Sequence, residues 1–460
     1  MYSVDDTIAA ISTPLGEGGI GIVKMSGPEV PAILRDVFVP SRVGNRSDAY
    51  WLPSSQRLYH GHIIDPETRE VIDEVLVSYM KAPRTYTCQD VGEINCHGGI
   101  VALRRVLELA LQRGARLAGP GEMTLRAFLF GRLDLAQAEA VLDVVRAKTE
   151  TGLKVAVDQL GGLLSREIRK IRAELVDVLA YVEALIDYGE DGIPEHDIAG
   201  SLRAASTALE QLIESAGRGM VYRQGIRAAI VGRPNVGKSS LLNCLLRTSR
   251  AIVTPLPGTT RDTLEETLNL RGIPLILVDT AGIAQSDHLV EKLGIERSRQ
   301  ALASADLAIL VIDAHESVQE TDREIAALIG DKPSILAFNK TDLPVLADLS
   351  GLLPGARAVW ISALTGEGLA ELENGIVDLV FSGQVASTES PMITNARHRQ
   401  ALLEAMHHAQ TALETHASGS HIDLMAIDLT SAVNGLGEIT GETVTEDLLE
   451  TIFGQFCVGK

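Results

Sequence analysis

The sequence predicts a multidomain protein of mixed α+β and α/β class, in which a parallel-sheet α/β domain is inserted into a helical domain that follows an N-terminal α+β domain. A chain of 460 residues is too long for one ordinary core, because domains average about 150 residues. The spacing of apolar residues changes along the chain from short runs to a helical period and then to alternating strands and helices. The helical period returns near the C-terminus, which indicates that the α/β segment interrupts one helical domain.

Residues 1–119 are expected to form the α+β domain. Short apolar runs such as Ile20–Val23, Val75–Met80 and Ile94–Cys96 are broken there by glycine and proline, as is typical of strands joined by turns. Residues 120–223 carry apolar side chains at helical spacing, and we expect them to form the first part of the helical domain.

Residues 224–381 alternate between strand and helix patterns, which favours a parallel sheet with helices on both faces. Residues 382–460 begin with a polar linker, continue with helical patterns and complete the helical domain. The expected strands of the inserted domain are Ile226–Val231, Ile273–Asp279, Leu307–Asp313, Ser334–Asn339 and Ala358–Ser362, and the expected late helices are Ala396–His416 and Thr445–Phe453.

Composition narrows the class of function. The chain has 41 lysines and arginines against 61 aspartates and glutamates, a net charge of −20 at pH 7, which argues against wrapping bare nucleic acid. The four cysteines are far apart and form neither a disulfide framework nor a zinc pattern. The N-terminus carries acids where a signal peptide carries bases, and no apolar stretch reaches the length of a membrane span. We therefore expect a cytoplasmic protein that does not bind a membrane.

A phosphate-binding loop follows the first strand of the α/β domain. Residues Gly232–Ser239 fit the pattern G-x-x-x-x-G-K-[ST] between a strand and the start of a helix. Its glycines let backbone N–H groups approach phosphates, while the helix N-terminus adds its dipole. Lys238 is expected to reach the β- and γ-phosphates, and Ser239 is expected to bind Mg²⁺.

Four further segments follow in an order that indicates GTP. Asp279–Gly282 ends a strand and offers a carboxylate near Mg²⁺ and an N–H group for the γ-phosphate. Asn339–Asp342 ends in a carboxylate that can accept hydrogen bonds from N1–H and the 2-amino group of guanine, which adenine lacks. Ser362 and Ala363 suit a contact with guanine O6, and Thr259–Asp262 supplies a hydroxyl for Mg²⁺. Their order predicts a GTPase.

The position after Gly282 holds Ile283, where a Ras-like site has a glutamine that orients the attacking water. The water must therefore be held by another group, and the transition-state charge requires a cation. Asn235 in the phosphate loop could offer its side-chain carbonyl to a monovalent cation, or it could only cap the loop. The residues alone leave both roles open.

Motifs outside the α/β domain extend the pattern to the whole chain. They are Asp6–Ala10, Gly18–Val23, Cys96–Gly99, Pro120–Glu122, Arg126–Leu129, Leu133–Ala140 and the C-terminal Cys-x-Gly-Lys tail Cys457–Lys460. With these motifs, the whole chain resembles the MnmE (TrmE) family of tRNA-modification GTPases. The resemblance implies an N-terminal tetrahydrofolate-binding and dimerisation domain, a helical domain, and an inserted TrmE-type G domain.

The resemblance also implies the ligands of the nucleotide and metals, for a GTPase that is stimulated by K⁺ and by contact between two G domains. The implied Mg²⁺ ligands are Ser239 and Thr260, and the implied K⁺ ligands are Asn235, Thr254, Leu256 and Thr259. The implied GTP-binding residues are Asn235, Val236, Gly237, Lys238, Ser239, Ser240, Thr254, Pro255, Leu256, Pro257, Gly258, Thr259, Thr260, Asp279, Thr280, Ala281, Gly282, Asn339, Lys340, Asp342, Ser362 and Ala363.

Two candidate catalytic residues for hydrolysis follow. Lys238 contacts the reacting phosphates, and Glu291 matches the general base of the family, which acts on the water through a relay. A carboxylate there would account for the missing glutamine. Without the resemblance, Glu291 is interpreted as a solvated acid on a helix face.

By resemblance, hydrolysis serves the addition of a carboxymethylaminomethyl or aminomethyl group to C5 of the wobble uridine in certain tRNAs. The one-carbon unit would come from 5,10-methylenetetrahydrofolate, with 5-formyltetrahydrofolate as the alternative bound folate. The work would be shared with an FAD- and NADH-using partner of the MnmG (GidA) type. The family also implies a homodimer that joins this partner in a heterotetramer or a larger complex.

The folate contacts of the family map onto Lys24, Glu93, Arg132 and Lys460. An acid suits the amino-pyrimidine edge of a pteridine, and bases suit its glutamate tail. Lys24 stands where arginine is usual and Arg132 where lysine is usual, so that charge is retained. Cys457 is a candidate catalytic participant in the modification, or else a thiol on a loose tail.

A second class of function stays open, namely a GTP-dependent interaction switch such as a ribosome-assembly GTPase. If the substrate is tRNA, the net charge of −20 predicts that the flavoprotein partner supplies most of the basic surface.

Overall fold

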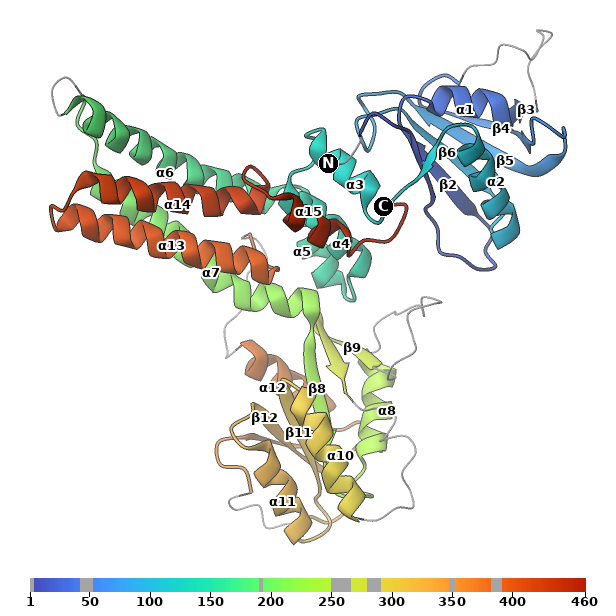
Figure 1. The fold of residues 1–460 in the computed structure, drawn as a ribbon. Coiled ribbons are helices and arrows are strands. Elements are labelled where there is room, and N and C mark those ends of the chain that lie inside the picture. Colours follow the sequence, from blue (N-terminus) through green and yellow to red (C-terminus); the bar gives the residue numbers. More distant parts are fainter. Residues whose placement is uncertain are drawn as a thin grey trace. The chain divides into compact units, whose positions relative to one another are not determined.

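Figure 1 shows a computed structural model of the chain, which divides into two compact units. Among the described residues, the first unit comprises residues 4–142 and 434–460, and the second comprises those between 143 and 433. The structure describes residues 4–41, 53–189, 193–249, 266–278, 291–346, 352–381 and 391–460.

The first unit is built around a seven-stranded sheet in the order β3-β4-β5-β6-β2-β1-β7. Neighbouring strands pair antiparallel, except that β1 and β7 are parallel. The strands are β1 (Ile8–Ile11), β2 (Gly21–Ser26), β3 (Phe38–Pro40), β4 (Arg57–Ile64), β5 (Val71–Met80), β6 (Val91–Cys96) and β7 (Arg116–Leu117). This arrangement confirms the predicted α+β class of the N-terminal part.

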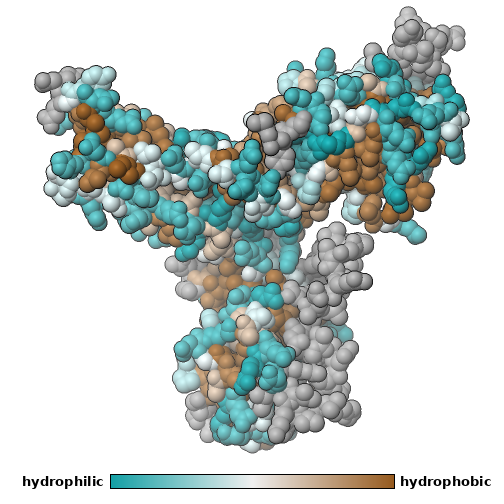
Figure 2. Space-filling view, in the orientation of Figure 1, coloured by the Kyte–Doolittle hydropathy of each residue, from teal (hydrophilic) through white to brown (hydrophobic). Residues whose placement is uncertain are grey.

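Helices α1 (Val30–Val37) and α2 (Ile100–Gln112) share one apolar core with this sheet. Strand side chains alternate between faces, and Val75 and Val77 on β5 are buried in that core. On the opposite face, Leu58 of β4 and Leu76 of β5 are 60% and 41% exposed. Apolar side chains are visible on the surface of this unit in Figure 2.

The first unit continues with α3 (Glu122–Leu129), the start of α4 (Leu135–Arg146), and α15 (Glu446–Phe453). Their apolar faces form a second core, to which Leu125, Leu135 and Phe453 contribute. Residues near the C-terminus therefore fold together with residues that follow the N-terminal sheet.

The second unit contains long helices that precede and follow an inserted sheet. α13 packs along α7, although the sheet separates them in sequence, and this confirms the prediction of an insertion. No helix within the described ranges is long and apolar enough to cross a membrane. The helices are α5 (Glu150–Leu160), α6 (Leu163–Tyr188), α7 (Ile198–Gln224), α13 (Ala396–Ala417) and most of α14 (Ile422–Thr440).

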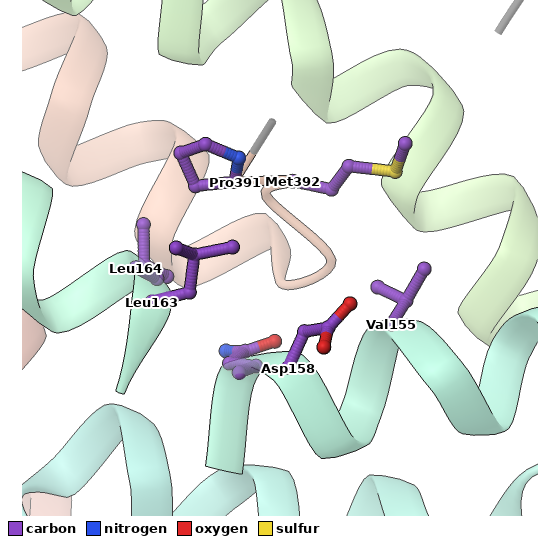
Figure 3. A pocket seen from close by; sticks show the side chains of 7 residues that line it. Val155, Asp158, Leu163, Leu164, Pro391 and Met392 are labelled. Carbon is purple, nitrogen blue, oxygen red and sulfur yellow. The ribbon is translucent and has the colours of Figure 1, made fainter. Parts of the chain in front are cut away.

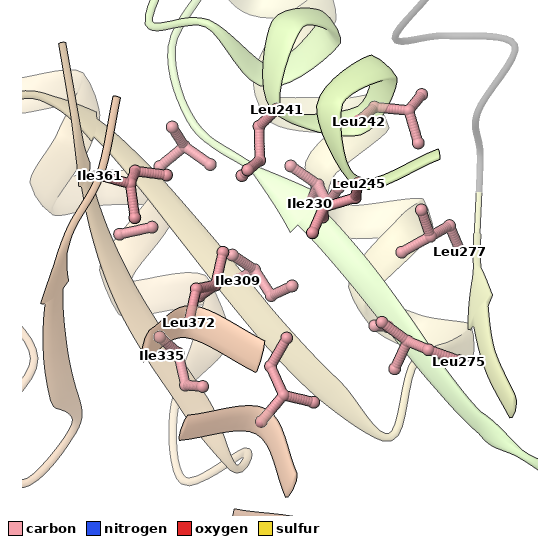
Figure 4. Close-up of a cluster of buried hydrophobic side chains, with 14 of the residues drawn as sticks. Ile230, Leu241, Leu242, Leu245, Leu275, Leu277, Ile309, Ile335, Ile361 and Leu372 are labelled. Carbon is pink, nitrogen blue, oxygen red and sulfur yellow. The ribbon is translucent and has the colours of Figure 1, made fainter. Parts of the chain in front are cut away.

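The inserted sheet has the order β13-β12-β11-β8-β10-β9. Helices cover both faces, as predicted, with one core beneath α8 and α12 and another beneath α10 and α11. Figure 4 shows the first core, where Leu241 and Leu245 of α8 point toward Ile230 and Ile309 of the sheet. The elements are β8 (Ile226–Val231), α8 (Lys238–Ser249), β9 (Glu266–Leu270), β10 (Ile273–Leu277), α10 (Glu291–Ser304), β11 (Leu307–Asp313), α11 (Glu320–Ile329), β12 (Ser334–Asn339), β13 (Arg357–Trp360) and α12 (Leu369–Phe381).

The sheet departs from the predicted all-parallel form at one edge. β9 pairs antiparallel with β10, and the sequence pattern did not predict this strand. The reason lies in Arg271 and Gly272, whose φ values of 52° and 92° fit the two-residue turn that joins antiparallel strands.

A small pocket lies where α5 meets α6 and the chain that returns from the inserted sheet (Figure 3). Gln159 on α5 accepts a hydrogen bond from Thr394 Oγ1 at 3.0 Å, and this bond is buried. It fastens the returning chain to α5. The pocket is lined by Val155, Asp158, Gln159, Leu163, Leu164, Pro391 and Met392.

Candidate functional site

The phosphate loop lies between β8 and α8, as the motif predicts. Asn235 has a φ of 65°, a left-handed conformation that asparagine tolerates better than most residues. Gly237 also has a positive φ, and a Cβ there would collide with the side chain of Asn339. Glycine is therefore required at this position by both conformation and space.

Lys238 lies against the loop itself. Its Nζ donates to the carbonyl oxygens of Gly232 and Arg233, at 2.8 and 2.5 Å. Burial, with a smaller contribution from the charge of Arg233, lowers the pKa of Lys238 to about 8. A phosphate group would favour the charged form of this amine. Arg233 is itself held by Asp322, a fully buried carboxylate that accepts from its Nε at 2.8 Å.

The segments predicted to read the base are joined to the phosphate loop. Asn339, which is 2% exposed, donates from Nδ2 to the carbonyl oxygen of Val236 at 2.8 Å. Its Oδ1 accepts from the Ala363 amide at 2.9 Å, so a guanine O6 would share that donor. Ser362 donates from Oγ to Asp342 Oδ1 at 2.6 Å and orients the carboxylate predicted to recognise guanine.

Lys340, within the same segment, has a φ of 67°, and its Nζ lies 2.6 Å from Asp313 Oδ2. The ion pair ties the Asn339–Asp342 segment to the end of β11. The fold thus brings together three segments that the sequence predicts to bind one nucleotide. They are the phosphate loop, Asn339–Asp342 and Ser362–Ala363.

Several predicted ligands cannot be placed in this way. Glu291 begins α10, and its side chain lies outside the described part of the structure. Thr254, Pro255, Leu256, Pro257, Gly258, Thr259, Thr260, Asp279, Thr280, Ala281 and Gly282 lie outside the described residues altogether. Ser239 and Ser240 begin α8 and are exposed, and Asn235 is exposed beside them.

A second cluster lies in the first unit, where β2 and β6 pair. Lys24 and Glu93 are directly opposite each other, with Nζ and Oε1 3.4 Å apart. The Lys24 ammonium and the Arg132 guanidinium lie over the ring of Tyr86, 5.1 and 4.8 Å from its centroid. Tyr86 shares a hydrogen bond with Thr124 Oγ1 at 2.9 Å, and burial raises the pKa of its hydroxyl.

Tyr86 was not among the predicted site residues, and its neighbours form no motif that would have revealed it. One carboxylate, two cations and an aromatic ring suit a flat heteroaromatic ligand that carries carboxylates. Three of the four predicted folate residues, Lys24, Glu93 and Arg132, therefore lie together.

The fourth, Lys460, belongs to a C-terminal tail whose backbone is docked onto the same unit. The amides of Gly121 and Met123 donate to the carbonyl oxygens of Cys457 and Lys460, at 3.3 and 3.2 Å. Ser12 donates from Oγ to the carbonyl oxygen of Gly459 at 3.1 Å. The tail is therefore held against β1 and the start of α3, and it presents Cys457 as an exposed free thiol.

Family models match both ends of the chain. One described as the MnmE helical domain matches residues 135–457. Another, described as the GTP-binding protein TrmE N-terminus, matches residues 7–132. Together these matches cover the N-terminal unit and the helices on both sides of the inserted sheet.

Curated relatives match the full chain. The tRNA modification GTPase MnmE of Roseiflexus sp. (strain RS-1) is 52% identical over 468 residues. The match covers 99% of this chain and 99% of that relative. The protein of the same name from Chloroflexus aurantiacus (strain ATCC 29366 / DSM 635 / J-10-fl) is 50% identical over 460 residues, which cover 99% of this chain and 100% of that relative.

Among solved structures, the G domain of the T. maritima FeoB iron transporter is 29% identical, with a TM-score of 0.24. The match covers 34% of this chain and 98% of that domain. The full-length relatives and the two family models show that the chain belongs to the MnmE (TrmE) family, and that it is a GTP-hydrolysing enzyme of tRNA modification.

Proposed function

We propose that this enzyme, with an FAD-dependent partner, adds a carboxymethylaminomethyl or aminomethyl group to C5 of the wobble uridine, using a one-carbon unit from methylenetetrahydrofolate. The cluster of Lys24, Glu93 and Arg132 around Tyr86 is the observation that carries this proposal. Glu93 accepts hydrogen bonds from the amino-pyrimidine edge of the pterin, and the two cations bind carboxylates of the glutamate tail. Lys460 and Cys457 reach the folate from the docked tail.

Hydrolysis is assigned to the inserted domain. Ser239 and Thr260 hold Mg²⁺, since hydroxyl oxygens suit this hard cation. Asn235, exposed at the phosphate loop, would hold K⁺ together with Thr254, Leu256 and Thr259, and a cation there would supply positive charge against the charge that develops on the phosphates. Lys238 binds the β- and γ-phosphates. Glu291 acts as the general base on the attacking water, through a relay.

The active form is a homodimer. Leu58 and Leu76 leave apolar area exposed on a sheet face, and covering such area favours association. Contact between the G domains of the two copies then stimulates hydrolysis. The domain limits that we propose are 1–119, 120–223, 224–381 and 382–460.

The partner brings FAD and NADH, and it forms a heterotetramer or a larger complex with the homodimer. With a net charge of −20, this chain alone binds tRNA weakly and loses it at modest salt, because phosphate binding requires basic surface. The four cysteines are free thiols, which fits the reducing cytoplasm.

Nucleoside analysis of bulk tRNA tests the proposal. We compare a strain that lacks the protein with the same strain carrying the intact gene. The modified wobble uridines should disappear in the first strain and return in the second. Unchanged wobble uridines in the deletion strain would instead favour the alternative function, a GTP-dependent ribosome-assembly switch.

A further inference from the structure

The turn between β9 and β10 is bound to the start of α5, within the second unit. Thr149 Oγ1 donates to the carbonyl oxygen of Gly272 at 2.8 Å and accepts from the amide of Gly152 at 3.1 Å. One hydroxyl, on a residue that is 6% exposed, thus caps α5 and binds the turn at the same time. Gly272 has a φ of 92°, and a Cβ there would collide with the side chain of Thr151.

Apolar packing strengthens this junction. Val155 on α5, Tyr222 at the end of α7 and Ile273 at the start of β10 belong to one buried cluster. The ring of Tyr222 also lies 5.6 Å from that of Phe381 at the end of α12, measured between centroids. The inserted sheet is therefore joined to the helices by a packed interface as well as by the Thr149 hydrogen bond.

The turn also has a special place in the sequence. β9 begins shortly after Thr260, and β10 ends just before Asp279. Thr260 is a predicted Mg²⁺ ligand, and Asp279 begins the segment that is predicted to approach Mg²⁺ and the γ-phosphate. β10 pairs in parallel with β8, which leads into the phosphate loop. Each strand that meets at the junction is thus connected to a phosphate-binding segment.

We propose that Thr149 is a positioning residue that couples the occupancy of the GTP site to the helical domain through the β9–β10 turn. A change in hairpin position between GTP and GDP moves the start of α5, because Thr149 is hydrogen-bonded to the turn and the side chain of Thr151 lies against Gly272. α5 follows α4, which begins in the first unit, and the signal reaches that unit along the chain. This inference rests on the proposed function, since it explains how hydrolysis drives the one-carbon chemistry.

Matched substitutions separate this coupling from ordinary stability. Thr149→Val removes both hydrogen bonds, whereas Thr149→Ser retains the hydroxyl. Asp197→Ala is the control for the lost cap, because Asp197 caps α7 through the amide of Gly200. Gly272→Ala adds a methyl group that pushes the turn away from α5. Gly355→Ala is its control, because Gly355 has a similar φ of 87° but an added Cβ there would meet no other atom within 4 Å.

The full-length variants are assayed in complex with the flavoprotein partner for GTP affinity, for GTP turnover and for tRNA modification. For Thr149→Val and Gly272→Ala we expect modification to fall about tenfold, with GTP affinity and turnover within about twofold of the parent. Thr149→Ser, Asp197→Ala and Gly355→Ala should modify tRNA at close to the parental rate. Hydrogen exchange at the Gly152 amide should differ between GDP and a non-hydrolysable GTP analogue in the parent, but not in Gly272→Ala.

Several results would overturn the coupling. Modification could be unchanged in both Thr149→Val and Gly272→Ala, or it could fall equally in the controls Asp197→Ala and Gly355→Ala. GTP turnover could fall in parallel with modification. Hydrogen exchange at the Gly152 amide of the parent could be the same with GDP and with the GTP analogue. A parent complex that hydrolyses GTP but modifies no tRNA would instead refute the proposed function. In that case the exchange measurement still decides whether the junction responds to the nucleotide.

Discussion

Asn339 Nδ2 donates to the carbonyl oxygen of Val236 at 2.8 Å, and this bond joins the Asn339–Asp342 segment to the phosphate loop. The same side chain accepts from the amide of Ala363 at 2.9 Å. One buried amide therefore links three segments that are far apart in sequence. It therefore holds the Asn339–Asp342 segment, which is predicted to recognise the base, against the phosphate loop.

Replacing this link should weaken nucleotide binding. Asn339→Ala leaves the buried Val236 carbonyl and the half-buried Ala363 amide without their partner. We expect the loosened site to lose about 2 kcal/mol of GTP binding, or roughly a thirtyfold rise in the Kd for GTP. Isothermal titration calorimetry measures the change. Asn95→Ala is the control, because Asn95 Nδ2 donates to the Leu76 carbonyl on an exposed sheet face. Equal affinities for GTP in all three proteins would contradict the linking role of Asn339.

Nucleotide affinity should depend on pH through Lys238. Burial lowers the pKa of its amine to about 8, and the phosphates bind the charged form. The Kd for GTP should therefore be nearly constant below about pH 8 and rise by up to about tenfold per pH unit above it. Fluorescence titration with a labelled GTP analogue measures this between about pH 7 and pH 9.5. A Lys238→Ala variant should bind weakly with no rise over this range, and a flat profile in the parent would exclude this role of Lys238.

The first unit should lose stability in acid because of a buried ionic cluster. Arg126, which is 1% exposed, donates to Asp6 Oδ1 at 2.5 Å and to Glu122 Oε1 at 3.1 Å. Burial raises the pKa of Glu122, but hydrogen bonds from Arg116, Gly119 and Arg126 outweigh it and leave the pKa below 4.5. The contribution of Glu122 is thus complete above pH 4.5 and is lost as the pH falls through the lowered pKa.

Glu122→Gln tests that cluster. It should destabilise the first unit by about 3 kcal/mol near neutral pH, because Arg126 stays buried with less compensating charge. The variant should also lose less stability than the parent as the pH falls. Calorimetric unfolding at several pH values measures both effects. Glu320→Gln is the control, since its pair with Arg323 is exposed and is worth about 0.5 kcal/mol or less. If both variants unfold like the parent, the cluster contributes nothing.

The choice of monovalent cation should control the rate of GTP hydrolysis. If Asn235 holds K⁺, turnover is faster in K⁺ than in Na⁺ at equal ionic strength, because Na⁺ is too small for the same oxygen ligands. Glu291→Ala should lose about hundredfold or more in turnover and keep its affinity for GTP. Glu296→Ala, on the same helix with an exposed side chain, should change neither. Phosphate-release assays in the two salts decide, and equal rates would refute the cation role.

Much of the inserted sheet could be predicted from sequence, because its central strands are buried on both faces and form continuous apolar runs. Ile226–Val231, Leu307–Asp313 and Ser334–Asn339 occur as strands with the predicted limits. β9 lacks such a run, since it is an edge strand with polar residues in Glu266–Leu270. Its pairing depends on the turn at Gly272.

The sequence indicates the phosphate loop and the segments Asn339–Asp342 and Ser362–Ala363 because each pattern is local in sequence. Tyr86 could not be predicted, since its role depends on the pairing of β2 with β6 and on the distant Arg132. Thr149 could not either, because it bonds a residue 123 positions away. Tertiary contacts of this kind leave no periodic signal in the sequence.

We expect GTP hydrolysis by this chain to drive the modification of tRNA. The most direct test reconstitutes the chain with its flavoprotein partner, tRNA, methylenetetrahydrofolate, FAD, NADH and a nitrogen donor, and it measures modified wobble uridine by mass spectrometry. Modification should occur with GTP and K⁺, and it should be absent with a non-hydrolysable GTP analogue. Equal modification with the analogue would contradict the claim.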